Sequence, residues 1–260
     1  MEKLSMDKTR LKSFLDEKYQ IYNQPKWVED DPISIPHRFT KKQDIEISGF
    51  LSAVIAWGNR KSILNNANKI LDIMDHAPYD FIIHHKPADL DKCAGFVHRT
   101  FNAQDLQYFI IALQRIYWYQ NSMDDLFRQL IDGGKFHQGI LSAFKRYFFQ
   151  IEHDFKREKH LSDPGKNSAA KRLNMFLRWM VRKDENGVDF GIWDSISPSD
   201  LSCPLDIHSG NVARQLGLLN RQQNDAKAVE ELDKALRSFD AKDPVKYDFA
   251  LFGLGVYEKF

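Results

Sequence analysis

The chain has 260 residues, a length that corresponds to one large domain or two small ones. Its 37 Lys and Arg residues nearly balance its 36 Asp and Glu residues, and 43% of its residues are hydrophobic. This composition excludes both a polybasic tail-type binder and a disordered chain. Two cysteines, Cys93 and Cys203, are too few for a four-thiolate zinc site or an iron–sulfur cluster, and no disulfide framework is indicated, so we expect a cytoplasmic protein. The sequence has neither a signal-peptide pattern at its start nor an apolar run long enough to span a bilayer, so we expect no membrane partner.

Apolar residues recur at three- and four-residue steps through most of the chain, which predicts helices and few strands. Residues 30–37 hold two prolines and predict an extended connector, and residues 150–167 form the longest polar stretch and predict a solvated connection between helical lobes. The expected fold class is all-α, with helices around 11–19, 44–57, 61–74, 103–119, 123–131, 136–148, 168–181, 207–216, 225–239 and 244–257.

One segment concentrates basic charge. Residues 166–183 read K-N-S-A-A-K-R-L-N-M-F-L-R-W-M-V-R-K, with six basic residues and no acid. On a helix, one side would carry the polar and basic residues Lys171, Asn174, Arg178 and Arg182. The opposite side, which includes Leu173, is apolar and is expected to be buried. Such a basic side is suited to phosphate contacts. The alternative is a helix whose arginines pair with carboxylates elsewhere in the chain.

A second segment, P-L-D-I-H-S-G-N-V-A-R, begins at Pro204. Asp206 precedes a helical pattern and is therefore predicted to be an N-cap, with its carboxylate accepting hydrogen bonds from the first amides of the helix. A capping aspartate can also take part in chemistry, so the two roles are compatible.

The same segment resembles the V-D-T-H-x-x-R-V-A stretch of the helix-hairpin-helix (HhH-GPD) base-excision DNA glycosylases. The combination of residues 168–182, D-F-G-I-W at 189–193, P-L-D-I-H at 204–208 and D-P-V-K-Y-D-F-A-L at 243–251 is more closely similar to an uncharacterised bacterial family distantly related to that superfamily. The resemblance implies a single all-helical unit of two lobes with a central cleft: a middle lobe over about 60–165 and an N-terminal segment that packs with 166–260.

For chemistry, the resemblance implies that Asp206 stabilises positive charge on the sugar as the glycosidic bond breaks, or activates the nucleophile. Bifunctional members add a lysine that attacks C1′, and the target base is first flipped out of the duplex. Their hairpin reads L-P-G-x-G-x-K, whereas here the region is L-S-D-P-G-K-N-S-A-A-K from Leu161, with only Gly165 retained. We assign the lysine role to Lys171 rather than Lys166, with a phosphate-contacting or salt-bridged surface lysine as the alternative.

The expected partner is DNA, or structured RNA. The residues expected to contact it are Lys166, Arg172, Arg178, Arg182, Trp57, Asn59, Arg60 and His208. For Trp57 and His208, packing in the core or a structural role is the alternative. His84, His85, Cys93 and His98 lack metal-site spacing, and we expect no metal and no cofactor.

Three functions follow. The leading one is excision of a flipped damaged base by hydrolysis of its N-glycosidic bond, with or without a lyase step. The second is a non-catalytic DNA- or RNA-binding protein that retains the fold. The third is a helical protein-interaction module or an enzyme acting on a small substrate, which the near-neutral charge favours.

Overall fold

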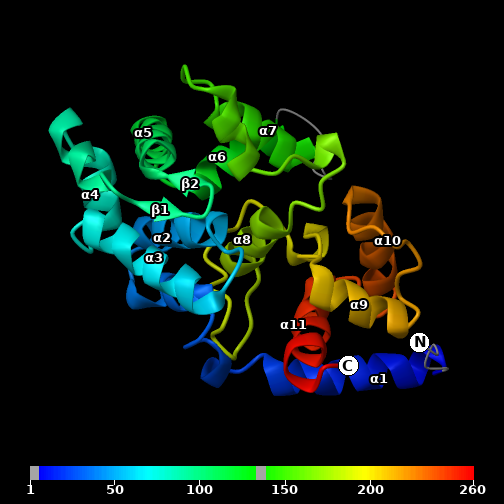
Figure 1. The fold of residues 1–260 in the computed structure, drawn as a ribbon. Helices are drawn as coiled ribbons and strands as arrows, with labels where there is room; N and C mark the ends of the chain where they lie inside the picture. Colours follow the sequence, from blue (N-terminus) through cyan, green and yellow to red (C-terminus); the bar gives the residue numbers. More distant parts are fainter. Residues whose placement is uncertain (1–5, 133–138) are drawn as a thin grey trace. The chain divides into compact units, whose positions relative to one another are not determined.

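The computed structural model describes residues 6–132 and 139–260, and the chain divides into two compact units. Unit 1 comprises residues 1–27 and 162–260, and unit 2 comprises residues 28–161. The described residues are predominantly helical, which confirms the all-α class (Figure 1). No helix among them has the length and apolar character needed to cross a membrane.

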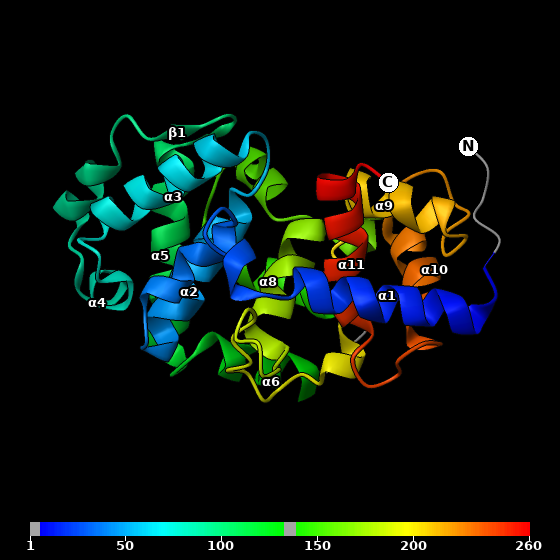
Figure 2. The ribbon, with the colours of Figure 1, turned by 90° about the horizontal axis from the view of Figure 1, so that it is seen from below.

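Unit 1 is built around the packing of its first α-helix on its last α-helix. Helix α1 (Lys8–Tyr22) lies against α11 (Tyr247–Gly253), as Figures 1 and 2 both show. Gly253 permits this approach, because a Cβ at that position would overlap the ring of Tyr22. The other helices of this unit are α8 (Lys171–Val181), α9 (Ile207–Gln215) and α10 (Ala226–Arg237), with short helices at Pro25–Trp27, Pro164–Lys166, Pro198–Asp200, Pro244–Lys246 and Leu254–Glu258.

Two sets of contacts hold the core of unit 1 together. One is an apolar cluster to which α1, α9, α10 and α11 contribute, with Leu15, Val212, Leu232 and Leu251 at its centre. The other surrounds α8, whose Trp179 is fully buried. The segment after α8 folds back over it, so that the backbone amides of Phe190 and Trp193 donate hydrogen bonds to the carbonyls of Trp179 and Met180. Burying both faces of α8 in this way leaves little of the helix in solvent.

Unit 2 has a core rich in aromatic side chains. The central helix α2 (Lys42–Val54) brings Phe50 within 6.0 Å of Phe109 and 5.5 Å of Phe148, measured between ring centroids. The Phe50 and Phe109 rings are stacked and the Phe50 and Phe148 rings are tilted, and such pairs add ring–ring attraction to the burial of their apolar surface. The other elements of the unit are α3 (Arg60–Ile73), α4 (Pro78–His84), α5 (Ala103–Tyr119), α6 (Met123–Asp132), α7 (Gly139–Phe148), the hairpin of β1 (Val97–His98) and β2 (Phe101–Asn102), and short helices at Pro32–Ser34, Pro36–Arg38, Pro87–Cys93 and Phe155–His160.

Several elements differ from the sequence-based expectation. The connector predicted at 30–37 is not extended but forms two short 3₁₀ helices, each with a proline in its first turn, where the missing amide hydrogen costs nothing. Helix α8 begins at Lys171, three residues later than predicted, because Ala170 adopts a left-handed conformation. The polar stretch at 150–167 buries His160, Leu161 and Pro164. Residues 136–138 of the helix predicted at 136–148 lie outside the described residues.

Candidate functional site

The candidate site lies where two helices of unit 1 begin. Lys171 is the first residue of α8, and Asp206 is the N-cap of α9, as the sequence predicted. The Oδ1 atom of Asp206 accepts hydrogen bonds from the Ser209 amide at 2.9 Å and the Ser209 hydroxyl at 3.2 Å. The Ser209 hydroxyl lies 2.9 Å from the amide of Asp206, which completes a reciprocal capping arrangement. One carboxylate oxygen of Asp206 is thereby fixed to the helix.

The other oxygen of Asp206 faces the lysine. Lys171 Nζ lies 3.7 Å from Asp206 Oδ2, and the side chains of Lys171 and Asp206 are 29% and 20% exposed. This pair, predicted from two separate segments, is therefore brought together and stays accessible to a ligand. The helix dipole of α9 stabilises the negative charge of Asp206 at the N-terminus of that helix. Lys171 also lies at a helix N-terminus, that of α8, where the helix dipole disfavours a positive charge.

A second carboxylate lies beneath this pair. Asp248, in the first turn of α11, is buried; Arg178 Nη1 donates to its Oδ2 at 2.5 Å, and the Cys203 thiol lies 3.7 Å from its Oδ1. Burial raises the pKa of Asp248 to about 6, and the charge of Asp206 adds to the rise, while Arg178 and Lys171 oppose it. Burial also raises the pKa of Cys203, so this cysteine is a thiol without nucleophilic character.

The basic side predicted for α8 does not face solvent. Arg178 is 8% exposed and Arg182 is 1% exposed. Arg178 Nε lies 3.3 Å from Asp189 Oδ1, in addition to its contact with Asp248. The expectation of a solvent-facing basic stripe is thus corrected at these two positions, because their guanidinium groups are bound to carboxylates inside unit 1.

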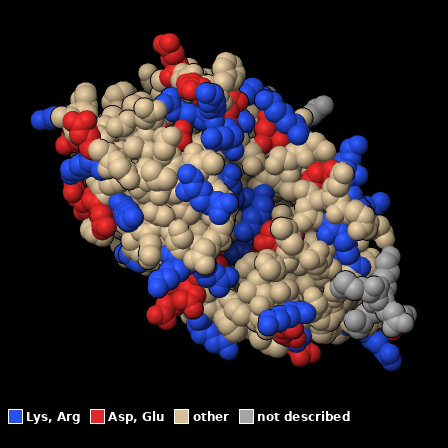
Figure 3. Space-filling view, in the orientation of Figure 1, with Lys and Arg blue, Asp and Glu red and all other residues tan. Residues whose placement is uncertain are grey.

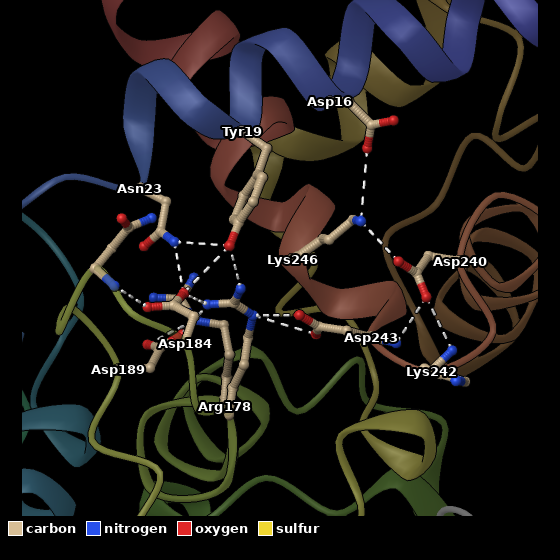
Figure 4. A network of polar contacts seen from close by, with 12 residues as sticks. Asp16, Tyr19, Asn23, Arg178, Asp184, Asp189, Asp240, Lys242, Asp243 and Lys246 are labelled. Atoms are coloured by element: carbon tan, nitrogen blue, oxygen red, sulfur yellow. Dashed lines mark hydrogen bonds and ion pairs between the residues drawn. The ribbon is translucent and has the colours of Figure 1, made fainter.

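Arg182 is the centre of this charge network, which comprises Arg178, Arg182, Asp184, Asp189, Asp243 and Asp248. Figure 4 shows part of it, with Arg178, Asp184, Asp189 and Asp243 labelled. The guanidinium of Arg182 lies 2.6 Å from Asp184, 3.2 Å from Asp189 and 2.9 Å from Asp243. It also donates to the hydroxyl of Tyr19 in α1 at 2.6 Å. Burial raises the pKa of Asp189 and of Asp243, against the opposing effect of the arginines. The network is a structural link among α8, α1 and the segment before α11.

The remaining unit 1 residues expected to contact nucleic acid differ in exposure. Lys166, at the end of a short helix, and His208, in the first turn of α9, are exposed. Arg172 is largely withdrawn from solvent, and burial lowers its pKa to about 10. Figure 3 shows Lys and Arg side chains interspersed with Asp and Glu side chains over the face it draws. These residues therefore differ in their individual exposure and do not form a continuous basic face.

Trp57, Asn59 and Arg60 belong to unit 2. The ring of Trp57 lies 4.9 Å from that of His98 and 6.2 Å from that of His160, between centroids. The backbone carbonyl of Trp57 lies 3.1 Å from His98 Nε2, and the other ring nitrogen of His98 contacts the Asn66 amide, so His98 donates to Trp57. Asn59 caps α3, and Arg60 is the first residue of that helix. Trp57 is partly exposed, with its ring fixed between two buried histidines.

The histidines and cysteines considered as metal ligands have other partners. His84 pairs with Asp80, His85 contacts the carbonyls of Phe81 and Ile82, and Cys93 is buried. Within residues 6–132 and 139–260, no three His, Cys, Asp or Glu side chains are grouped so that they could hold a metal ion.

Two residues that contact the segments carrying Asp206 and Lys171 were not predicted from the sequence. Asn224 donates a hydrogen bond from Nδ2 to the carbonyl of Asp206 at 2.8 Å. The adjacent Asp225 accepts one from Asn167, which precedes Lys171 by four residues, at 3.2 Å. Asp225 could have been recognised as the N-cap of the helix predicted to follow it, a role it has for α10. Its contact with Asn167 joins residues far apart in the sequence and leaves no local signal.

Comparison with known proteins gives a family and no established activity. A family model described as a protein of unknown function (DUF2400) matches residues 31–257, and the chain therefore belongs to this family. No curated protein and no solved structure matches the chain.

Proposed function

We propose that this member of the DUF2400 family is a DNA-binding enzyme that excises a flipped damaged base, with Asp206 and Lys171 as its catalytic residues. The observation that carries the proposal is the 3.7 Å separation of Lys171 Nζ and Asp206 Oδ2 at two adjoining helix starts. Both residues were selected from the sequence for a role in which they must act on the same atom, C1′ of the sugar. The proposal extends to the type of fold, two helical lobes as in the HhH-GPD glycosylases.

The chemistry needs both groups. Asp206 takes the proton that leaves the ammonium of Lys171, and the free amine attacks C1′ of the flipped nucleotide. The C1′–N bond to the base breaks as the Nζ–C1′ bond forms, and the base leaves with the bonding electrons and takes up a proton. Nζ then loses a second proton, the C1′–O4′ bond breaks as the C=N bond forms, and O4′ takes up a proton. The ring-opened product is a protonated Schiff base between Lys171 and the sugar. In a hydrolytic variant, Asp206 instead stabilises the positive charge on the sugar while water attacks.

The turn that precedes α8 supports the proposal. In the alignment that places Lys171 on the lysine of the L-P-G-x-G-x-K pattern, instead of the one that retains Gly165, the first glycine of the pattern falls on Asn167. Asn167 has φ 63°, a left-handed conformation that glycine adopts freely and asparagine tolerates better than other residues. A left-handed residue at this position is what a glycine of the pattern would allow, and this supports the proposal. Because Ala170 gives α8 no side-chain cap, the first amides of the helix are suited to a DNA phosphate.

In this proposal, Lys166, Arg172 and His208 of unit 1 contact the backbone or sugar of DNA. Unit 2 has its own proposed contacts with nucleic acid, Trp57, Asn59 and Arg60. Trp57 would stack on a base, as aromatic side chains do in proteins that bind unpaired nucleotides. Arg178 and Arg182 are left out, because their guanidinium groups are buried in the charge network.

Borohydride trapping tests the proposal directly. Wild type, Lys171→Ala and Asp206→Asn are incubated with duplexes that carry uracil, 8-oxoguanine, hypoxanthine or an abasic site, and borohydride converts any Schiff base to a stable adduct. We expect an adduct with wild type, none with Lys171→Ala, and a rate lower by about 10²-fold or more with Asp206→Asn. Asparagine caps helices as well as aspartate does, so this variant should fold normally.

Lys227→Ala is the matched control, since Lys227 is an exposed lysine elsewhere in unit 1 and its loss should leave trapping unchanged. If wild type forms no adduct and releases no base from any duplex, the catalytic proposal is wrong.

The second candidate is a non-catalytic protein that binds DNA or structured RNA. Asn167 and Ala169 stand at the two glycine positions of the pattern when Lys171 is its lysine, and the loss of both glycines from the turn that holds the phosphate favours this candidate. It predicts binding that weakens with salt, is reduced by Lys166→Glu and is indifferent to Asp206→Asn.

A further inference from the structure

The loop that joins α9 to α10 contacts both segments that carry the candidate pair. Asn224 lies over the first turn of α9. Its Nδ2 donates to the carbonyl of Asp206 at 2.8 Å, and its Oδ1 accepts from Arg214 at 2.5 Å. A Cβ added at Gly210 would lie 2.8 Å from Oδ1 and 3.0 Å from Nδ2 of Asn224. The glycine therefore leaves the room that the Asn224 amide occupies.

The next residue, Asp225, contacts the turn before Lys171. Its Oδ2 accepts from Asn167 Nδ2 at 3.2 Å, its Oδ1 accepts from the Ala228 amide at 3.1 Å, and the backbones of Asp225 and Ser168 form an antiparallel bridge. Arg221 Nε donates to Asp225 at 2.6 Å and holds the carboxylate in place. This hydrogen bond to Arg221 lowers the pKa of Asp225, so the carboxylate stays ionised.

Two consecutive residues thus connect the segment of Asp206 with the segment of Lys171, which are far apart in the sequence. We infer that Asn224 and Asp225 are positioning residues that set the separation of Lys171 Nζ and Asp206 Oδ2. This inference rests on the proposed function, because it concerns the alignment of the same two groups. It assigns catalytic importance to residues that touch neither the substrate nor the reacting atoms.

The reason to expect a large effect is geometric. A displacement of about 1 Å in an aligned catalytic group lowers a reaction rate by about 10²-fold, whereas binding of the rest of the substrate is unaffected. Loss of the Asn224 contact would let the start of α9 move relative to the start of α8. The maximal rate should then fall while the substrate concentration at half-maximal rate stays the same.

The experiment measures single-turnover trapping across a range of duplex concentrations for wild type, Asn224→Ala, Gly210→Ala and Gln222→Ala. We expect Asn224→Ala to lower the maximal rate by about 10²-fold with an unchanged half-saturation concentration. Gly210→Ala displaces the Asn224 amide without deleting it, so it should also lower the rate. The overlap costs stability and the helix preference of alanine offsets part of that cost, so urea midpoints are measured for every variant and rates are compared where each is fully folded. Gln222→Ala, in the same loop, should behave as wild type.

Maximal rates equal to wild type in both Asn224→Ala and Gly210→Ala would overturn the inference and leave the proposed function intact. If wild type forms no adduct, the proposed function fails instead. Crystal structures of wild type and Asn224→Ala then decide the inference: a separation of Lys171 and Asp206 that widens supports it, and an unchanged one overturns it.

Discussion

Asp248 is buried and interacts electrostatically with both residues of the candidate pair. Its carboxylate binds Arg178 directly and lies near enough to Asp206 and Lys171 for their charges to act on its pKa. A carboxyl group in this position has two opposing influences, since burial favours its neutral form and the adjacent cations favour its charged form. The pKa of about 6 shows that burial dominates.

This balance predicts a pH-dependent contribution to stability. Asp248 has a pKa of about 6 in the folded protein and 3.8 as the ordinary value, so the folded state binds its proton more tightly than the unfolded chain does. Its contribution is therefore fully present below about pH 4 and is lost as the pH rises to about 6. Relative to Asp248→Asn, the free energy of unfolding of wild type should fall by up to about 3 kcal/mol over that interval.

Urea unfolding of both proteins at several pH values measures this difference. Asp91→Asn, a substitution at an exposed aspartate of unit 2, is the control and should track wild type. A difference between wild type and Asp248→Asn that stays constant with pH would contradict the assignment.

For single residues, the sequence predicts roles that depend on residues nearby in the chain, such as helix capping. Asp206 was recognisable as an N-cap because a helical pattern follows it directly. The burial of Arg178 and Arg182 was not recognisable, since their partners Asp189, Asp243 and Asp248 are spread over later segments. A run of basic residues in a sequence does not show whether its side chains are exposed to solvent or paired with carboxylates from elsewhere in the fold. The sequence left both alternatives open, and the structure supports pairing at these two positions.

Among the elements, α8 depends on Arg182 for its connection to the rest of unit 1. Replacing Arg182 with methionine leaves Asp184, Asp189 and Asp243 without their shared cation, and removing one partner of a buried ion pair costs about 3–5 kcal/mol. We expect Arg182→Met to lower the free energy of unfolding by that amount in urea titrations. Lys166→Met, at an exposed lysine before the same helix, should change it by less than about 0.5 kcal/mol. Equal stability of the two variants would contradict the structural role of Arg182.

The elements that the sequence predicted best are those with strong periodicity and a recognisable cap. Helix α5 begins and ends at Ala103 and Tyr119 as predicted, with Asn102 as its N-cap. Helix α4 was missed because its seven residues are too few to establish a period. The start of α8 was predicted three residues too early because Ala170 is left-handed, whereas alanine prefers the right-handed helical conformation. The bridge between Ser168 and Asp225 adjoins this turn, and a contact between residues so far apart in the sequence has no local signal. The helix preferences of the residues are enough to predict long helices, whereas tertiary contacts determine where short helices form and where helices begin and end.

For the whole molecule, the division into two units predicts different behaviour of fragments. Unit 2 is continuous, and its aromatic core comes from residues 28–161 alone. We expect a fragment of residues 28–161 to fold cooperatively, as judged by dispersed amide resonances and a sigmoidal urea transition. A fragment of residues 162–260 lacks α1 and should not fold by itself, because Leu15, Tyr19 and Tyr22 cover α11 in unit 1.

A synthetic peptide of residues 1–27 should restore the helical circular dichroism of the 162–260 fragment. A peptide with Leu15→Asp is the control, since a charge at this fully buried position prevents packing. Independent folding of residues 162–260 without the peptide would show that α1 is dispensable.

The same discontinuity bears on the order in which the chain becomes structured during synthesis. Helix α1 leaves the ribosome before unit 2 does, whereas α11, against which it packs, emerges after unit 2. All of unit 2 is translated in the interval, so it can fold while α1 still exposes Leu11, Leu15, Tyr19 and Tyr22 to solvent. In the nascent chain, the apolar face of α1 therefore stays without its packing partner until α11 has been made.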